Sequence, residues 1–466
     1  MSTNKLIRVS FIVIIILAFS CKNSKSRLTS LTKADLQGYY EQQGEGQIIA
    51  INDSIVTSYY SSSFNCYPNW EISRAYFNKQ TPNLNILDKE TFTYKEGFTT
   101  YTYKKLSQKP RYCKELTEKQ KNDYDYNFET LWNTFNDQYA FFKERTIDWK
   151  KVKEKYKAKY NDETRRFDFY TILKDMVLEL QDTHSDFEVP DEFEKQWERL
   201  YLKSDTTDYE NLVKDKIINK YVKQLKKYNG NELTWGLIND DIAYIQLNGM
   251  DALANYKTTD AAKYWEIAEK SDDYFTDVIK GTHYITKKIV TDIKDTKYCI
   301  IDLRFNGGGY DQVGLAFMSH FIKYEYDVFK KKRRFRNGFA GEQTIGLEPS
   351  KKPYLNPIYL LTSPYTASAA ETTILATMNF PHFKRVGSNT NGALSDLLLK
   401  ELPNGWLYAL SNEVYETMDG IVYEVSGIPS NYNIDYPKDE EEFYKSMLEE
   451  LKNKDRAIEK VIELSK

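Results

Sequence analysis

The fold class of this chain is decided by one stretch, Ile300-Ile301-Asp302-Leu303-Arg304-Phe305-Asn306-Gly307-Gly308-Gly309. The run from Tyr298 to Leu303 is almost continuously apolar, as in a strand with both faces buried. The triple glycine marks a tight turn whose backbone N–H groups can face an oxyanion or a phosphate. Neither a G-K-[ST] sequence nor a G-x-G-x-x-G spacing is present, which disfavours a phosphate. A turn without any ligand is the plain alternative.

Strands and helices alternate on both sides of this stretch. The pattern predicts strands at 242–247, 298–303 and 358–362, and helices at 265–293 with a break near Gly281, at 315–322 and at 366–378. This alternation predicts an α/β domain with a mostly parallel sheet. We place this core at 233–437 and expect an amphipathic C-terminal helix at 438–466.

Three regions precede the core. Residues 31–113 consist of short runs rich in Tyr, Thr, Ile and Phe, separated by Gly, Asn, Asp and Pro, which predicts a β-rich N-terminal domain. In 115–189, apolar residues such as Phe128 and Leu131 recur at steps of three and four, which predicts a helical domain. Residues 190–232 are highly charged and are expected to form a solvated helical connector.

The first thirty residues have the pattern of an export signal. Lys5 and Arg8 precede an 11-residue, nearly apolar run, which is too short to span about 30 Å of hydrocarbon as a helix. The run leads into Cys21, and a small residue directly before a Cys resembles a bacterial lipobox. We therefore expect a lipoprotein signal peptide at 1–21, lipidation of Cys21 and a tether at 22–30. A lipid anchor would place the protein in the cell envelope, on a membrane and facing the periplasm or the exterior. The alternative is an ordinary signal peptide with an incidental Cys, and either way we expect the protein to leave the cytoplasm.

Composition excludes several classes of protein. The chain has 466 residues, with 41% hydrophobic and 29% charged, an ordinary globular balance that excludes wholesale disorder and a multi-span membrane protein. It has 65 Lys and Arg against 68 Asp and Glu, a net charge of −3. A nucleic-acid-binding protein is normally basic, so we expect no nucleic-acid partner.

The cysteines and histidines do not indicate a metal centre. The chain has only four His and neither a CxxC pair nor an HExxH motif, so we expect no metal and no cofactor. Cys66 and Cys113 either pair in an oxidising compartment or remain free thiols, and the sequence leaves this open. Cys299 lies in an apolar strand and is expected to be buried.

A candidate nucleophile lies in the segment Leu360-Leu361-Thr362-Ser363-Pro364-Tyr365-Thr366-Ala367-Ser368-Ala369-Ala370-Glu371. It reads as a strand, a tight turn and the start of a helix, which would expose Ser368 at the carboxyl edge of the sheet. Unsatisfied N–H groups at a helix start favour developing negative charge, as a nucleophilic serine requires. The alternative is that Thr366 or Ser368 only caps the helix.

A candidate base lies in Leu180-Gln181-Asp182-Thr183-His184-Ser185-Asp186, at the end of a predicted helix. A single His is more often structural than catalytic, but here a hydroxyl and several acids adjoin it. None of the other three His has comparable neighbours.

Taken together, these segments resemble the tail-specific (C-terminal processing) serine protease family. Residues 302–309 resemble its D-L-R-x-N-x-G-G motif, 366–371 its T-x-S-A-A/S-E motif and 387–392 its G-x-x-T-x-G motif. The segment around His184 resembles the D-x-H-T/S motif of the tricorn-core and interphotoreceptor-retinoid-binding-like branch. Ala393 stands where the Ser-Lys branch has its catalytic Lys, which favours the His branch. About fifty residues separate His184 from the core, too few for a PDZ domain.

The resemblance implies a crotonase/ClpP-like α/β catalytic core and a serine endopeptidase acting on peptides or proteins. It implies that Ser368 is the nucleophile and His184 the general base, with Glu424 orienting the imidazole through the Thr183 hydroxyl. The implied oxyanion hole consists of backbone N–H groups of Ala369 and Gly308. With Cys21 lipidated, the enzyme would be tethered to a membrane.

Two alternatives remain on the same scaffold. One is an inactive protein that binds a lipid or peptide, since fold does not imply function. The other is an esterase, although the G-x-S-x-G elbow of lipases is absent.

Overall fold

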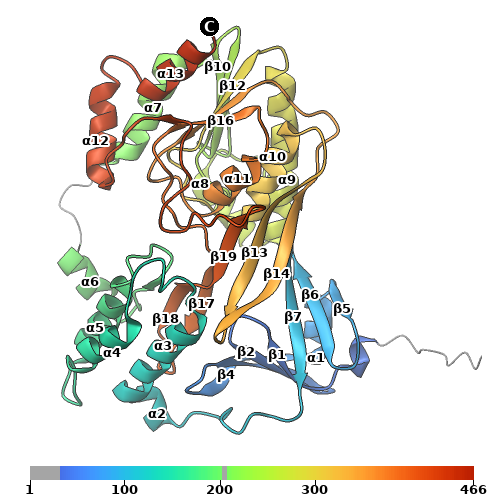
Figure 1. The fold of residues 1–466 in the computed structure, drawn as a ribbon, viewed down its shortest axis with the longest axis vertical. Coiled ribbons are helices and arrows are strands. Elements are labelled where there is room, and N and C mark those ends of the chain that lie inside the picture. The colour runs from blue at the N-terminus through green and yellow to red at the C-terminus, as the bar shows by residue number, and fades with distance from the viewer. Residues whose placement is uncertain (1–31, 202–206) are drawn as a thin grey trace, which may run out of the picture.

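The structure is a computed structural model that describes residues 32–201 and 207–466 (Figure 1). The predicted signal peptide and tether at 1–30, including Cys21, lie outside the described residues. Among the helices of the described ranges, none combines the length and the apolar character needed to cross a bilayer.

The N-terminal region forms one antiparallel seven-stranded sheet, which lies at the lower right of Figure 1. Its elements are η1 (Lys33–Asp35), β1 (Gly38–Gln42), β2 (Gln47–Ile51), β3 (Ile55–Ser61), β4 (Cys66–Ser73), α1 (Arg74–Gln80), β5 (Leu84–Ile86), β6 (Thr91–Glu96) and β7 (Thr99–Leu106). The strand order is β4-β3-β2-β1-β7-β6-β5. A β-rich N-terminal region is therefore present, as predicted.

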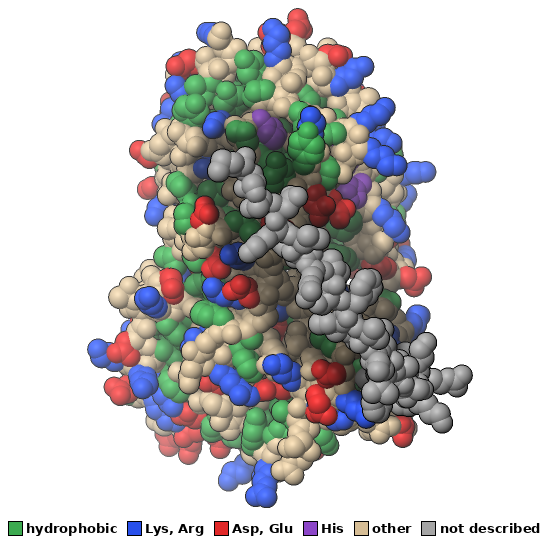
Figure 2. All heavy atoms as spheres, turned by 45° about the vertical axis from the view of Figure 1, so that its right-hand side comes forward, with side chains coloured by type: hydrophobic (Ala, Val, Ile, Leu, Met, Phe, Trp, Pro, Cys, Tyr) green, Lys and Arg blue, Asp and Glu red, His purple; other side chains and the backbone are tan. Residues whose placement is uncertain are grey.

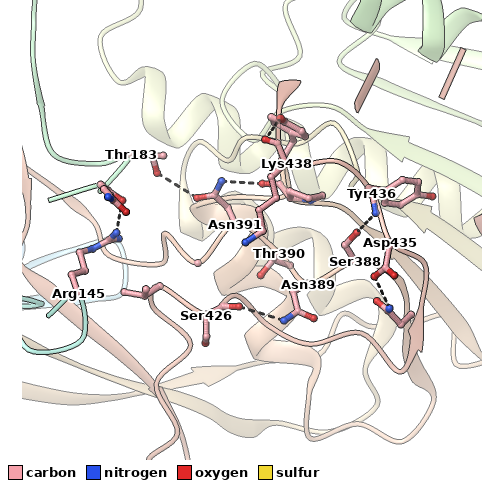
Figure 3. A pocket seen from close by; sticks show the side chains of 16 residues that line it. Arg145, Thr183, Ser388, Asn389, Thr390, Asn391, Ser426, Asp435, Tyr436 and Lys438 are labelled. Atoms are coloured by element: carbon pink, nitrogen blue, oxygen red, sulfur yellow. Dashed lines mark hydrogen bonds between the residues drawn. The ribbon is translucent and has the colours of Figure 1, made fainter. Parts of the chain in front are cut away.

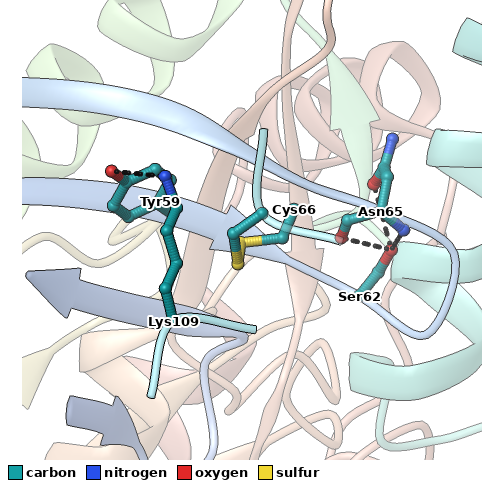
Figure 4. The surroundings of a disulfide bond; sticks show 6 residues. Tyr59, Ser62, Asn65, Cys66 and Lys109 are labelled. Atoms are coloured by element: carbon teal, nitrogen blue, oxygen red, sulfur yellow. Dashed lines mark hydrogen bonds between the residues drawn. A yellow bond between two sulfur atoms is a disulfide. The ribbon is translucent and has the colours of Figure 1, made fainter. Parts of the chain in front are cut away.

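A disulfide closes this domain. Cys66, at the start of β4, is bonded to Cys113, which follows β7 by seven residues. Figure 4 shows the bond between the Lys109–Tyr59 hydrogen bond on one side and the Ser62–Asn65 turn on the other. The pairing that the sequence leaves open is therefore present in the structure.

Helices follow, at the lower left of Figure 1. They are α2 (Glu118–Asn122), α3 (Tyr124–Gln138), α4 (Trp149–Lys157), α5 (Arg166–Leu178) and α6 (Glu194–Tyr201), with the short strand β8 (Asp186–Phe187) after α5. Residues spaced by three or four on α3 and α5, among them Phe128, Leu131 and Leu173, share one apolar core. Trp406 and Tyr408 from the later part of the chain complete that core.

The α/β core is built on a second seven-stranded sheet, in the order β20-β16-β15-β12-β11-β10-β9. The strands are β9 (Lys223–Tyr228), β10 (Leu233–Asn239), β11 (Ile242–Leu247), β12 (Tyr298–Asp302), β15 (Ile358–Thr362), β16 (Phe383–Gly387) and β20 (Tyr432–Asn433). From β11 to β20 all pairs are parallel. The carboxyl ends of β12 and β15 therefore meet at one edge of the sheet, and this brings the triple glycine beside the Ser368 turn.

Helices cover both faces of this sheet. They are α7 (Tyr209–Tyr221), α8 (Ala261–Ala268), α9 (Tyr274–Ile293), α10 (Asp311–Met318, extended by η2 at Ser319–Phe321), α11 (Ala369–Thr377), α12 (Glu440–Glu450) and α13 (Arg456–Leu464). Successive strand residues point to opposite faces. Ile301 thus packs with α9, α10 and α11, whereas Ile300 packs with α7, α12 and α13.

Further strands extend from the α/β core and contact the other two regions. These are β13 (Tyr326–Phe335), β14 (Gly338–Leu347), β17 (Leu397–Glu401), β18 (Leu407–Ser411) and β19 (Glu413–Thr417). β18 pairs with β8, and the Tyr67 hydroxyl donates to the Glu401 carbonyl at 2.6 Å. The buried guanidinium of Arg333 lies 3.2 Å from Glu45 of the N-terminal domain and 2.7 Å from Glu413. The sequence analysis did not predict these strands.

Three expectations about boundaries were wrong. Helix α9 runs through Gly281 without a break; glycine stands there because a side chain would lie 2.0 Å from the Leu253 carbonyl oxygen, and not because the helix ends. The predicted C-terminal helix is two helices, since Asp455 caps a new one. The predicted helical connector ends in strand β9, which pairs with β10.

Charges are mixed on the surface. On the face shown in Figure 2, Lys and Arg side chains are interspersed with Asp and Glu over both halves of the molecule. Such a face presents no extended field of one sign among its described residues.

Candidate active site

Ser368 occupies the turn between β15 and α11, in a backbone conformation that is costly for a residue with a side chain. Its φ is 55° and its ψ −126°, and the half-buried serine immediately precedes the first residue of α11. Backbone strain of this kind persists only where the surrounding structure imposes it, and it gathers at functional sites. Here the Ser368 N–H donates to the Ala393 carbonyl at 3.0 Å.

A buried carboxylate, Glu371, fixes this turn. Its Oε2 accepts from the Ser368 N–H at 3.2 Å and from the Ala393 N–H at 2.8 Å. Its Oε1 accepts from the Thr390 hydroxyl at 2.5 Å and from the Gly392 N–H at 2.8 Å. Burial raises the pKa of Glu371 to about 7, although these donors act in the opposite direction. Glu371 thus joins the serine turn to segment 390–393, a role that the sequence analysis did not assign.

The glycine turn lies directly against the serine. A Cβ on Gly308 would be 2.6 Å from the Ser368 Cβ and 2.9 Å from the Ala369 nitrogen. Ala369 begins α11, so its N–H has no acceptor within the helix. The Gly308 N–H, however, donates to Asn306 Oδ1 at 2.8 Å and is already engaged. Of the two predicted oxyanion donors, only Ala369 has an N–H that these contacts leave open.

His184 lies in the turn between α5 and β8, half-buried. Its Nδ1 is 2.6 Å from the Ser395 carbonyl oxygen. Because a carbonyl only accepts hydrogen bonds, Nδ1 must carry the proton, and the neutral ring then has its lone pair on Nε2. The ring therefore has the tautomer that a general base requires.

Glu424 is hydrogen-bonded to the backbone segment that His184 contacts. Its Oε2 accepts from the N–H groups of Leu394 at 2.8 Å and Ser395 at 3.1 Å. Burial, followed by the nearby Asp182 carboxylate, raises the pKa of Glu424 to about 8. The link from Glu424 to the imidazole therefore runs through the backbone of Ser395, whose N–H donates to Glu424 and whose carbonyl accepts from His184.

Thr183 does not make the relay that the resemblance implies. Its side chain is exposed, and the hydroxyl donates to Asn391 Oδ1 at 3.4 Å. No hydrogen bond of the described residues joins Thr183 to Glu424. The hydroxyl faces the open cleft because the turn that positions His184 directs the neighbouring side chain outward.

Arg145, which the sequence analysis missed, lies between two buried carboxylates. Its Nη2 is 3.6 Å from both Asp182 Oδ1 and Glu424 Oε1. Nη1 donates to the carbonyl oxygens of Leu180 and Gln181, just before the base. Asp182 also accepts from the Tyr139 hydroxyl at 2.8 Å. Because these groups come from distant parts of the chain, no local sequence signal marked Arg145.

The segment Ala393–Ser395 brings the two predicted catalytic residues to one place. Ser368 donates to the first residue of this segment, and His184 to the last. No hydrogen bond among the described residues joins Ser368 Oγ to the imidazole. Catalytic hydrogen bonds are often long before substrate binds, so this arrangement is compatible with a nucleophile and its base.

A polar cleft of about 710 Å³ lies beside these residues (Figure 3). One wall comes from the helical region and the other from the loops of the α/β core. The lining residues are Arg145, Gln181, Thr183, Pro364, Tyr365, Ser388, Asn389, Thr390, Asn391, Gly392, Val425, Ser426, Asn433, Asp435, Tyr436 and Lys438. Within residues 32–201 and 207–466, no three His, Cys, Asp or Glu side chains gather as metal ligands would.

Comparisons with known families match two parts of the chain. Residues 241–434 match the model of Peptidase family S41, and residues 120–177 match that of the Tricorn protease C1 domain. No sequence among curated proteins matches. The two family matches confirm the resemblance that the motifs indicate.

Solved structures are similar over most of the chain. A protein from Parabacteroides merdae, classed as a peptidase, has a TM-score of 0.56 and 20% identity, over 74% of this chain and 96% of its own. For the photosystem II D1 C-terminal processing protease the TM-score is 0.42 and the identity 14%, over 71% of this chain and 98% of that one. The tricorn protease has a TM-score of 0.34 and 14% identity, over 89% of this chain and 47% of its own. The first of these shows a shared fold, and the predicted fold class is confirmed.

Proposed function

We propose that this chain, a serine-type peptidase whose residues 241–434 match Peptidase family S41 and whose residues 120–177 match the Tricorn protease C1 domain, is an endopeptidase that forms an acyl-enzyme on Ser368. His184 is the general base in this proposal. The observation that carries it is the shared attachment of both residues to segment Ala393–Ser395.

In the proposed mechanism, Ser368 Oγ attacks the carbonyl carbon of the scissile bond while Nε2 of His184 takes the hydroxyl proton. The imidazolium keeps its Nδ1–H on the Ser395 carbonyl and later gives the Nε2 proton to the leaving amine. Water then repeats the sequence on the acyl-enzyme and releases the acid. Glu424 acts by accepting the Ser395 N–H, which keeps the backbone of Ser395 in place.

The tetrahedral intermediate carries a negative oxygen that needs hydrogen-bond donors. The Ala369 N–H at the start of α11 is one, and the helix start adds favourable potential. The second donor in this proposal is the Gly308 N–H, which would divide its proton between Asn306 Oδ1 and the oxyanion. Arg145 lies between Asp182 and Glu424 and keeps both side chains in place near the base.

The test is Ser368→Ala. We expect loss of peptide hydrolysis and of labelling by a fluorophosphonate, with the fold retained, because loss of a helix-capping hydroxyl costs at most about 1–2 kcal/mol. Ser54→Ala, at an exposed serine of the N-terminal domain, is the control and should be labelled like the wild type. Labelling or hydrolysis that survives in Ser368→Ala would indicate another nucleophile, whereas a wild-type protein that is neither labelled nor active would support the binding-protein alternative.

We also propose that the enzyme is exported and tethered to a membrane through lipidated Cys21. The Cys66–Cys113 disulfide supports an oxidising compartment, since such bonds are rare in the cytosol. The apolar run that leads into Cys21 supports the anchor. The substrate in this proposal is a peptide or protein outside the cytoplasm.

A further inference from the structure

We propose that the polar cleft is a substrate subsite for a hydrophilic, carboxylate-bearing stretch of peptide, and that Lys438 is the residue that selects it. This inference rests on the proposed peptidase function, which it deepens by naming the substrate chemistry.

The cleft adjoins both predicted catalytic residues. Thr183 in one wall precedes His184, and Gly392 in the other precedes Ala393, which accepts the Ser368 N–H. Tyr365 lies three residues before the serine. A peptide chain held at Ser368 would therefore have the residues on one side of its scissile bond within this cleft.

The lining suits polar side chains. Ten of the sixteen lining residues carry a hydroxyl or a side-chain amide, and only Pro364 and Val425 are aliphatic. Sites that bind apolar side chains are lined mainly by apolar groups. An apolar residue would displace water from this polar lining without replacing the hydrogen bonds of that water, which costs affinity.

The charges of the cleft favour a carboxylate at one place. Arg145 is already neutralised, because it lies between Asp182 and Glu424. Among the described residues, Lys438 has no ion-pair partner, and Figure 3 shows its side chain extending across the cleft towards Thr390.

The one acid in the lining is turned away from this ammonium. Asp435 Oδ1 accepts from Asn433 Nδ2 at 2.7 Å, away from Lys438 in Figure 3. Asp439, beside Lys438 in the chain, accepts from the Glu442 N–H at 3.0 Å as the N-cap of α12. A substrate carboxylate therefore has no competitor bonded to the Lys438 ammonium.

The backbone of Lys438 is fixed to the cleft wall. Its carbonyl accepts from the Tyr365 hydroxyl at 2.7 Å, and the Tyr365 ring packs 4.9 Å from that of Phe443 on α12. These contacts fix the point where the Lys438 side chain leaves the wall, and so they limit the part of the cleft that its ammonium can reach.

The experiment uses internally quenched peptides that differ at one position, with Asp, Asn, Leu or Lys placed in turn on each side of the scissile bond. Each is made with a free and an amidated C-terminus, which separates an acidic side chain from a terminal carboxylate. We expect kcat/KM to be about fivefold higher for Asp than for Leu at one position on one side, consistent with a partly exposed ion pair. A preference seen only with the free C-terminus would assign the carboxylate to the chain end.

Variants of Lys438 test whether this residue causes the preference for Asp. Lys438→Met should remove the preference for Asp over Asn, and Lys438→Glu should reverse it in favour of Lys peptides. Asp435→Asn is the matched control in the same cleft and should retain or increase the preference for Asp. An apolar preference, or an acidic preference that Lys438→Glu leaves unchanged, would overturn the inference while the peptidase stands. Failure of the peptidase itself would show separately, as labelling and hydrolysis that do not depend on Ser368.

Discussion

Arg145 lies where the helical region meets the α/β core. It is the cation next to Asp182 and Glu424, whose side chains are 0% and 2% exposed. Removing one partner from a buried ionic group leaves the others uncompensated and is strongly destabilising. Because Asp182 precedes the base and Glu424 holds the Ser395 backbone, an uncompensated Asp182 charge and the lost contacts of Arg145 would displace His184.

Arg145→Ala should therefore lower kcat/KM by about 10- to 100-fold, a loss of about 1.4–2.7 kcal/mol of transition-state stabilisation. Arg145 also lines the open cleft, so millimolar guanidinium should restore part of the activity, whereas urea, which is neutral and of similar shape, should not. Arg165→Ala, whose exposed side chain pairs only with Asp168, is the control. Wild-type activity in Arg145→Ala would contradict this role.

Glu424 should make the stability of the protein depend on pH. Its pKa is raised to about 8 in the folded protein, mainly by burial. A raised carboxyl pKa means that the folded state holds its proton more tightly than the unfolded chain, so this contribution is full below about pH 4.5 and is lost as the pH rises to about 8.

Glu424→Gln should therefore lose less unfolding free energy than the wild type between pH 5 and pH 8, as measured by urea titration. The exposed Glu342→Gln should keep the wild-type dependence. A slope in Glu424→Gln as steep as that of the wild type would mean that other groups carry the effect.

At the scale of one element, helix α9 depends on glycine at a single point. Gly281 packs against the Leu253 carbonyl, 2.0 Å from where a Cβ would lie, and a backbone oxygen has little freedom to move. Gly281→Ala should destabilise by about 1–3 kcal/mol despite the higher helix propensity of alanine. Gly338→Ala, with no atom within 4 Å of the added carbon, should change the unfolding free energy by less than about 0.5 kcal/mol. An equal effect of the two changes would contradict this packing argument.

At the scale of the whole molecule, the three regions are fastened to one another by buried polar contacts. The Lys400 ammonium is buried and donates to the Glu45 and Gly46 carbonyls of the N-terminal domain, and burial lowers the pKa of Lys400 to about 8. The N-terminal domain is therefore attached to the part of the chain that also carries the base-holding segment. Its distance from any membrane would be set by residues 22–30.

The proposed anchor is tested on the full chain. Cys21→Ser should abolish metabolic labelling with a radioactive fatty acid and release the protein from the membrane fraction, because the acyl chains supply the anchoring free energy at about 0.8 kcal/mol per buried CH₂. The disulfide-bonded Cys66 and Cys113 are matched controls whose replacement should leave lipid labelling unchanged. An unlabelled wild-type protein with its N-terminus elsewhere would leave an ordinary exported enzyme.

Local sequence determined the elements whose signals are local. Apolar runs predicted β11, β12 and β15, because a strand buried on both faces has a continuous apolar sequence. The oxyanion hole that the resemblance implies requires the glycine turn beside the Ser368 segment, and parallel pairing of β12 with β15 brings them together.

The tertiary structure decided what depends on residues far apart in the chain. Arg304 is wholly buried between Asp302 and Asp455, so the Arg of the D-L-R motif fastens α13 to the sheet. The partners of Arg145, the engagement of the Gly308 N–H and the outward Thr183 likewise follow from packing between distant segments. Such contacts have no period and no fixed spacing in the sequence, and only the folded chain brings their members within hydrogen-bonding distance.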